Sequence, residues 1–234
     1  MNTQASNLAR DTILSSIRRN LAASLPFDAV HREHQTDKRA HTVNDVAGNR
    51  SVDLDVNTLT EIFSENLRSV GGHCTVVGNE LAATRAIQEI VASSGARHIA
   101  MSDSHVVQNL CSFISCDVEI LKNVASADLF NCDLGITSAQ YAIAETGTLV
   151  LESECERNRL ASLVPPVHVC ILDARDIRAR MSDVLDALQT NGRENLSRAV
   201  TFITGPSRTS DIELTLAIGV HGPRELHVIV INNA

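Results

Sequence analysis

CTVVGNELAATRAIQEIVASSGARHIAM, residues 74–101 of this 234-residue chain, has the pattern of a strand, a helix and a second strand. The apolar run at 74–77 predicts a short buried strand. Residues 82–92 have helical periodicity that ends near Gly95, and residues 98–101 predict the next strand. Because a helix between two strands with short connections is typical of a βαβ unit, this stretch predicts parallel strands packed against helices.

The same alternation extends in both directions from this unit. Helical periodicity begins after Asp55 and stops at Gly71-Gly72, where glycine ends a helix. We expect an α/β protein with a mainly parallel central sheet and helices on both faces. The strands near Gly147 and Val167 are candidates for an antiparallel pair, which would make the sheet mixed. The remaining elements are expected as helices at 59–70, 104–113, 139–142 and 177–188, and as strands at 118–121, 134–137, 148–151, 167–172, 200–203 and 226–231.

The N-terminal part of the chain differs in character from the rest. Apolar residues at helical spacing predict a peripheral helix that closes at Pro26, and residues 28–53 are mostly polar. His31, His34 and His41 lie in this polar segment, but no apolar anchor accompanies them, so a solvated segment is favoured over a metal site. We therefore expect an N-terminal helix and polar linker at 1–54 and an α/β domain at 55–234.

Composition argues against several classes of protein. A formal charge of −8 and an aromatic content of 3% disfavour binding to duplex or single-stranded nucleic acid. No apolar run approaches the length of about 18 residues that a membrane span needs, and no secretory signal is evident, so we expect a cytoplasmic protein. The six cysteines include no C-x-x-C pair. This predicts free thiols, with neither a metal nor an iron–sulfur cluster on this chain.

The segment GPSRTSDIE, residues 205–213, follows an apolar strand and is a candidate anion site. Hydroxyl groups, a guanidinium and backbone amides gather where we expect a helix to begin, an arrangement that favours a carboxylate or a phosphate. Ser210 and Glu213 also have the spacing of a capping box, a role that is compatible with ligand binding. The candidate ligand-binding residues are Gly205, Pro206, Ser207, Arg208, Thr209, Ser210 and Asp211.

A second candidate is the stretch AETGT, residues 144–148. Glu145 is a tentative catalytic residue, because a carboxylate beside Thr-Gly-Thr can serve as a general base. Thr146, Gly147 and Thr148 are candidate ligand contacts. The alternative is a turn glycine beside a solvated glutamate.

Two further loops carry polar candidates. Arg159 and His168 flank a proline-stiffened approach to a strand, and His168 has a pKa range suited to proton transfer, although a lone histidine is more often structural. His221, the second tentative catalytic residue, and Gly222 precede the last strand. Ligands bind at the carboxyl ends of strands in open α/β sheets, so His221 meets the segment after Thr204 there only if the chain doubles back.

Residues 144–231 resemble the LUD domain family, the lactate utilisation protein C proteins. The resemblance rests on AETGT (144–148), Arg159 with SLVP (162–165) and His168, GPSRTSDIE (205–213) and GVHGPR (219–224), in the order of the family. It implies a three-layer α/β/α fold like that of the NagB/RpiA/CoA-transferase superfamily. It also implies a subunit of a complex that oxidises L-lactate to pyruvate, with no cofactor on this chain and iron–sulfur clusters in partner subunits.

Two other functional classes remain open, because a fold does not imply a function. The chain could be a stand-alone isomerase or CoA-transferase-like enzyme on a phosphorylated or CoA-linked substrate, with Glu145 as base or nucleophile. Alternatively, it could be a non-catalytic module that binds a small anion and regulates or scaffolds its partners. Turnover by the purified chain would favour the enzyme, whereas loss of a stable complex on its removal would favour the subunit.

Overall fold

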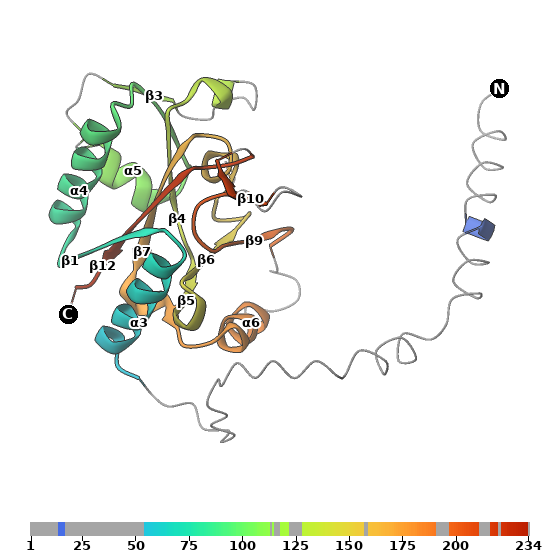
Figure 1. The fold of residues 1–234 in the computed structure, drawn as a ribbon. Helices are drawn as coiled ribbons and strands as arrows, with labels where there is room; N and C mark the ends of the chain where they lie inside the picture. The colour runs from blue at the N-terminus through green and yellow to red at the C-terminus, as the bar shows by residue number, and fades with distance from the viewer. Residues whose placement is uncertain are drawn as a thin grey trace. The chain divides into compact units, whose positions relative to one another are not determined.

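The computed structural model (Figure 1) describes residues 14–16, 54–112, 114, 118–121, 128–156, 159–190, 197–210, 216–219 and 221–233. The chain divides into two units, residues 1–51 and 52–234, and the elements below belong to the second. In the first unit the structure describes residues 14–16, which are helical and exposed. The polar segment with His31, His34 and His41 lies outside the described residues, and the boundary at residue 54 stays a prediction.

A six-stranded sheet forms the centre of the second unit, in the order β1-β12-β7-β4-β2-β3, and all its pairings are parallel. Strand β7 is buried along nearly its whole length, as expected of a parallel strand covered on both faces. The predicted mainly parallel sheet is confirmed. The strand bounds are β1 His73–Val77, β2 His98–Met101, β3 Glu119–Leu121, β4 Leu134–Ser138, β7 Val167–Asp173 and β12 Glu225–Ile231.

Helices cover both faces of this sheet, because successive residues of a strand point to opposite sides. On one face, α4 and α5 contribute to a core in which Ile87 packs with Val169 of β7. On the other face, α3 places Phe63 in a core with Cys170 of the same strand (Figure 1). The three-layer arrangement is therefore confirmed. The helix bounds are α3 Val56–Ser69, α4 Glu80–Ser94, α5 His105–Cys111 and α6 Met181–Thr190.

The ends of these helices follow the local sequence. The Asp55 side chain accepts hydrogen bonds from the backbone N–H groups of Asn57 and Thr58, at 2.9 and 3.0 Å, and so caps the start of α3. Gly71, just beyond α3, and Gly95, the C-cap of α4, have φ values of 89° and 66°. Both predicted glycine stops are confirmed, because this left-handed conformation costs glycine little.

A second, four-stranded sheet, in the order β8-β5-β6-β9, lies on the α3 side of the central sheet. Its strands β5 and β6 form an antiparallel hairpin, with Ala142 opposite Leu149. Leu149 faces the core shared with α3, whereas Val150 packs with Val184 of α6. The strand bounds are β5 Tyr141–Ile143, β6 Thr148–Glu152, β8 Ile177–Arg178 and β9 Val200–Ile203.

This second sheet corrects three expectations. The predicted helix at 139–142 is wrong, since β5 begins at Tyr141 and pairs with β6 and β8. The helix predicted from Ile177 begins only at Met181, because residues 177–178 join the second sheet as β8. The strands near Gly147 and Val167 do not pair, since β6 lies in one sheet and β7 in the other. In each case tertiary pairing overrides a short-range pattern.

The helix expected to begin in the Gly205 segment is also wrong. Residues 208–210 form strand β10 (Arg208–Ser210), which pairs antiparallel with β11 (Leu216–Ile218). Residues 211–215 lie outside the described residues, so the capping role of Ser210 and Glu213 stays a prediction. Short 3₁₀ helices connect other elements at Asp128–Asn131, Ala144–Thr146, Arg159–Ser162 and Ala174–Asp176. No helix in the described part of the chain has the length and apolar character to cross a membrane.

Candidate functional site

A pocket with a volume of about 240 Å³ lies where the amino ends of β7 and β12 meet β9 of the second sheet. It brings together five of the residues that the sequence singled out: His168, Gly205, Ser207, His221 and Gly222. Among the others, Ser162, Leu163 and Pro223 belong to the SLVP and GVHGPR motifs that carry the family resemblance, whereas sequence reasoning missed Thr201, Phe202, Ile203, Thr204 and Leu226. These additional lining residues are Ser162, Leu163, Thr201, Phe202, Ile203, Thr204, Pro223 and Leu226.

The pocket lies at the edge of the sheet opposite to the one expected. His168 is the second residue of β7, and Leu226 is the second residue of β12, so the pocket opens at the amino ends of these strands. A strand at 200–203 in the parallel sheet predicts a site at the carboxyl ends. Instead, β9 pairs antiparallel with β6 in the second sheet, and this carries Gly205 to the amino edge. His221 reaches the same edge directly, because its loop leads into β12.

His168 is the most deeply buried polar group of the pocket, with 0% of its surface exposed. Its Nε2 lies 2.8 Å from Thr137 Oγ1, whereas its Nδ1 has no hydrogen-bond partner among the described residues. Burial lowers the pKa of His168 to about 3, so the ring is neutral at physiological pH. A neutral imidazole has one donor and one acceptor nitrogen. One of the two nitrogens is therefore without a hydrogen-bond partner among the described residues.

Ser162 reaches the pocket because a 3₁₀ turn packs directly on β4. A Cβ at Gly135, the residue of β4 that pairs with His168, would overlap the carbonyl oxygen of Ala161. Only glycine permits this close approach. The Ser162 hydroxyl donates to the Arg159 carbonyl oxygen at 2.6 Å and keeps acceptor capacity. Arg159 itself is exposed and does not line the pocket.

A chain of hydroxyl groups joins the 144–148 motif to the pocket. Thr146 Oγ1 lies 2.7 Å from Thr148 Oγ1, which lies 2.7 Å from Thr204 Oγ1. Thr148 is buried and Thr204 lines the pocket, so both predicted threonines reach the site through Thr204. Their contribution is indirect.

Backbone hydrogen bonds hold the two pocket loops together. The Ser207 N–H donates to the Pro223 carbonyl oxygen at 2.7 Å, and the Gly219 N–H donates to the Ser207 carbonyl oxygen at 3.0 Å. A Cβ at Gly222 would lie 3.1 Å from Ser207 Cβ and 3.3 Å from its Oγ. A larger side chain at position 222 would therefore press on Ser207 and reduce the pocket.

Glu145 lies outside this pocket. Its Oε1 accepts a hydrogen bond of 2.9 Å from the Met181 N–H, the first residue of α6, and the side chain lines a separate hollow with Leu59 and Arg180. A carboxylate at this position stabilises a helix N-terminus. Gly147, with a φ of 64°, allows α3 to approach, since a Cβ there would lie 2.7 Å from the Asn66 carbonyl carbon. The structure thus gives Glu145 and Gly147 structural contacts.

Arg208 also turns away from the pocket. Its guanidinium donates a hydrogen bond to the carbonyl oxygen of Val70, the C-cap of α3, and a Cβ at Gly71 would lie 2.7 Å from Arg208 Nη2. Pro206 packs on the same glycine, and a Cβ at Gly205 would lie 2.8 Å from the Val70 carbonyl oxygen. A cation at a helix C-terminus is stabilising. Gly205, Pro206 and Arg208 of the predicted anion motif therefore pack against the C-terminal end of α3.

Thr209 and Ser210 belong to β10, and Asp211 lies outside the described residues. Among the described lining residues there is no lysine or arginine, and the titratable groups are His168 and His221. No group of three or more metal-ligating side chains occurs in the described part of the chain. The pocket can therefore donate and accept hydrogen bonds but supplies little fixed charge.

The fold and this pocket define a three-layer α/β protein with a small pocket, lined by apolar and uncharged polar side chains, at the amino edge of its parallel sheet. The chain belongs to the LUD domain family, whose model matches residues 60–231. The resemblance seen in residues 144–231 is thereby confirmed.

The relatives extend this assignment. The chain is 30% identical to a protein named lactate utilization protein C from Halalkalibacterium halodurans, over 94% of this chain and 97% of that protein. It is 45% identical to an uncharacterized protein of Neisseria meningitidis over 43% of each chain, and 38% identical to the lactate utilization protein C of Deinococcus radiodurans over 46% of this chain. These last two alignments cover 43% and 50% of the relatives.

A solved structure has the same fold. A DUF162 family protein from Deinococcus radiodurans superimposes with a TM-score of 0.59 over 76% of this chain and 99% of that chain. The two sequences are 23% identical, so the likeness concerns the fold alone.

Proposed function

We propose that this chain works in the use of L-lactate, as a subunit of a complex that oxidises lactate to pyruvate. The observation that carries the proposal is the nearly full-length similarity to the protein named lactate utilization protein C from Halalkalibacterium halodurans. The match reaches beyond the family domain, so it includes both the N-terminal part and the pocket loops. The coarse role in lactate utilisation rests on this similarity, and the subunit role extends it.

In this proposal the electron carriers sit in partner proteins. The thiols of Cys74, Cys132, Cys155 and Cys170 are free, and Cys132 and Cys170 are buried. Burial raises the pKa of the Cys170 thiol, which disfavours the thiolate that a cluster requires. Separate, protonated thiols are poor cluster ligands, so iron–sulfur partners would supply the redox centres.

The pocket at the amino edge would hold a small carboxylate. Ser207 and Ser162 hydroxyls and the imidazole of His168 line it, and its volume of about 240 Å³ suits a small molecule. Because the described lining has no fixed cation, a monocarboxylate would cost less to bury than a phosphate dianion. The loop at Gly205 then contributes through Gly205 and Ser207 rather than through a guanidinium.

The alternative of a stand-alone isomerase or CoA-transferase-like enzyme needs Glu145 as its reactive carboxylate. That carboxylate accepts a hydrogen bond at the start of α6 and lines a different hollow, so no observation favours this alternative. A non-catalytic anion-binding module would use the same pocket. Turnover by the purified chain would favour the stand-alone enzyme, and loss of a stable complex on removal of the chain would favour the subunit.

The test combines growth with binding. A strain without this chain should fail to grow on L-lactate as sole carbon source but grow normally on glucose, and the wild-type gene should restore growth. Ser207→Ala should weaken L-lactate binding to the purified chain, measured by calorimetry, by about five- to tenfold for one lost hydrogen bond. Glu145→Gln, outside the pocket, is the matched control and should bind normally.

Two results would contradict the proposal. Normal growth of the deletion strain on lactate would remove the role itself. Failure of the tagged wild-type chain to retain cysteine-rich iron–sulfur proteins from lactate-grown cells would remove the subunit role while leaving the coarse one intact.

A further inference from the structure

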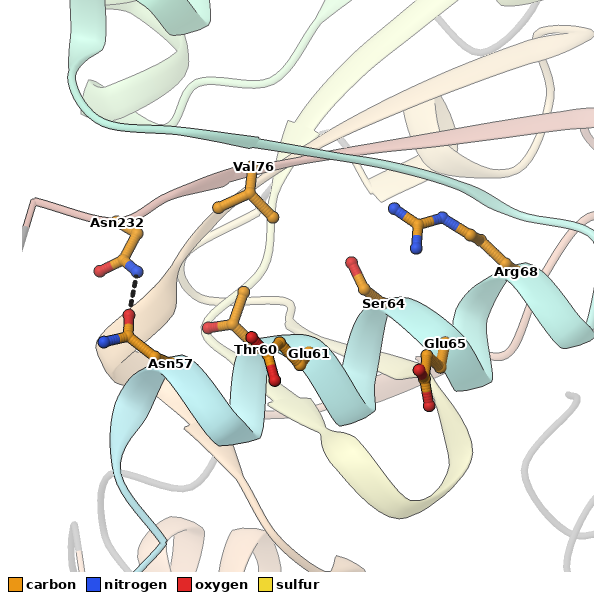
Figure 2. A pocket seen from close by; sticks show the side chains of 8 residues that line it. All are labelled: Asn57, Thr60, Glu61, Ser64, Glu65, Arg68, Val76 and Asn232. Carbon is orange, nitrogen blue, oxygen red and sulfur yellow. Dashed lines mark hydrogen bonds between the residues drawn. The ribbon is translucent and has the colours of Figure 1, made fainter.

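A groove with a volume of about 430 Å³ separates α3 from strand β1, away from the pocket described above. Figure 2 shows Ser64 and Arg68 of α3 directed toward β1, with Val76 on the strand facing them. The groove contains none of the residues that the sequence singled out. It follows an edge of the central sheet, because β1 pairs only with β12 among the described strands. Its lining residues are Asn57, Thr60, Glu61, Ser64, Glu65, Arg68, Val76 and Asn232.

The outer edge of β1 offers hydrogen-bonding groups to another strand. The Asn232 N–H donates to the Val77 carbonyl oxygen at 2.8 Å. The backbone N–H and C=O groups of Val77, and of every second residue before it, therefore point toward β12. The backbone N–H and C=O groups of Cys74 and Val76 therefore point away from β12, toward the free edge of the sheet. In agreement, Arg68 Nη2 donates to the Cys74 carbonyl oxygen at 3.3 Å. Val76 is also 47% exposed, unusual for an apolar strand residue beside a groove. An edge of this kind is a template for strand pairing.

The charges beside this edge are arranged so that they complement a reversed copy of themselves. Glu61 and Glu65 come first along α3 and Arg68 comes last, and all three are exposed. None of them forms an ion pair within the described part of the chain. If a second α3 runs antiparallel beside the first, the acidic half of each helix faces the basic end of the other.

We propose that this face binds a second copy of the same chain around a twofold axis. The two β1 strands pair antiparallel about Thr75, so that Cys74 lies opposite Val76 of the partner subunit and the central sheet continues across the interface. The two α3 helices lie antiparallel on the same side of that sheet. Glu61 then faces Arg68 of the partner subunit, twice, as an isologous interface requires.

One axis satisfies both parts of this arrangement. The contact between Arg68 and Cys74 at one end of the groove and the hydrogen bond between Asn57 and Asn232 at the other show that α3 runs antiparallel to β1. With a rise of about 1.5 Å per helical residue and about 3.3 Å per strand residue, the first contact places Thr75 beside about residue 66 of α3 and the second places it beside about residue 62. The midpoint of Glu61 and Arg68 lies between these two points.

Because one twofold axis accounts for both the strand pairing and the charge pairing, a second copy is favoured over an unrelated partner. A foreign strand would need matching charges of its own, whereas this chain already carries both halves of the pattern. Thr60 and Ser64, the buried residues of the groove on α3, are small and would let the second helix approach closely. The Cys74 carbonyl oxygen has two lone pairs, so it can keep Arg68 while accepting a strand hydrogen bond.

The test is the mass of the full chain in solution, measured by light scattering and by sedimentation over a range of concentrations. The wild type should be a dimer. Glu61→Arg and Arg68→Glu should each place like charges together twice and raise the dimer dissociation constant at least about tenfold. The double variant Glu61→Arg/Arg68→Glu should restore the dimer, which a merely structural effect of either residue would not do.

A second variant tests the strand contact. Val76→Pro removes an N–H that faces outward and spares the ladder to β12, so it should give a folded monomer by circular dichroism. Leu81→Ala, at an apolar residue on α4 that is 62% exposed, is the control and should remain dimeric. A wild type that is monomeric at all concentrations, or single charge variants that stay dimeric, would overturn the proposal.

Discussion

Arg208 donates a hydrogen bond from its guanidinium to the carbonyl oxygen of Val70, 138 residues earlier in the chain. Val70 is the C-cap of α3, so the arginine satisfies a carbonyl that the helix itself leaves without a partner. A side chain that looked in sequence like an anion ligand thus joins the pocket loop to the helix that packs against the central sheet. The contact also explains why Gly71 and Gly205 flank it without side chains of their own.

From this contact we expect Arg208→Ala to lower the free energy of unfolding by about 1 kcal/mol, because a charge-assisted bond at a helix C-terminus is lost. Urea denaturation measures the change. Arg198→Ala is a suitable control, since the Arg198 side chain is 94% exposed and its carboxylate partner is 4.0 Å away. The expectation would be wrong if the Arg208 variant kept its full stability and lost only ligand affinity.

Gly147→Ala should be far more damaging, with a loss of about 2–4 kcal/mol of stability. The φ of 64° is unfavourable for alanine, and the new Cβ would lie 2.7 Å from the backbone carbonyl carbon of Asn66 in α3. Thermal unfolding provides the measurement. At Gly78 a Cβ would meet nothing within 4 Å, so Gly78→Ala should be close to neutral. Equal effects of the two substitutions would contradict this account.

His168 should make the stability of the chain depend on pH in the acid range. Its pKa falls from 6.5 to about 3 on folding, because burial disfavours the charged ring. The unfolded chain therefore binds the extra proton between these values, and stability falls as the pH drops from about 6.5 toward 3, with a slope of up to about 1.4 kcal/mol per pH unit. Above pH 6.5 this residue adds no pH dependence.

The check is to measure unfolding free energies across this range for the wild type and for His168→Asn. The variant should lose that part of the slope. His105→Asn, at an exposed histidine that begins α5, should keep it. If the His168 variant retains the full slope, the ring is not held neutral in the folded chain.

Glu156 should behave in the opposite sense. It is 0% exposed, its Oε1 accepts a hydrogen bond of 2.9 Å from the Ser138 N–H, and its Oε2 has no partner among the described residues. Burial raises the pKa of this carboxyl above its usual value of 4.5, so its contribution to stability declines as the pH rises above 4.5. Glu156→Gln keeps an acceptor for Ser138 and removes the charge.

We therefore expect Glu156→Gln to be at least as stable as the wild type at pH 8, by about 0–2 kcal/mol, with the advantage vanishing near pH 4. Chemical denaturation at the two pH values measures it. Glu154→Gln, at a side chain that is 57% exposed, is the matched control. A large loss of stability for the Gln variant at pH 8 would mean that the buried carboxylate has a cationic partner.

Much of the fold could be predicted from local patterns. The apolar strands at 98–101, 134–137, 167–172 and 226–231 were identifiable because parallel strands buried on both faces are continuously apolar. The strand at 74–77 was also identified, but its predicted burial is wrong, since β1 lies at an edge of the sheet and Val76 is 47% exposed. Helix stops at Gly71 and Gly95 followed from the left-handed conformation that glycine tolerates. By contrast, residues 141–143 and 208–210 are strands only because other strands pair with them.

The site divides in the same way. The sequence by itself determined the family and identified His168, Ser207, His221 and Gly222 as polar or small residues in loops, because residue type and spacing are local properties. Only the tertiary structure decided that these four share one pocket, whereas Glu145 accepts a hydrogen bond at the start of α6 and Arg208 donates one at the end of α3. Whether a polar side chain faces a ligand cavity or satisfies a helix end depends on which strands pair, and strand pairing depends on contacts between residues far apart in the chain.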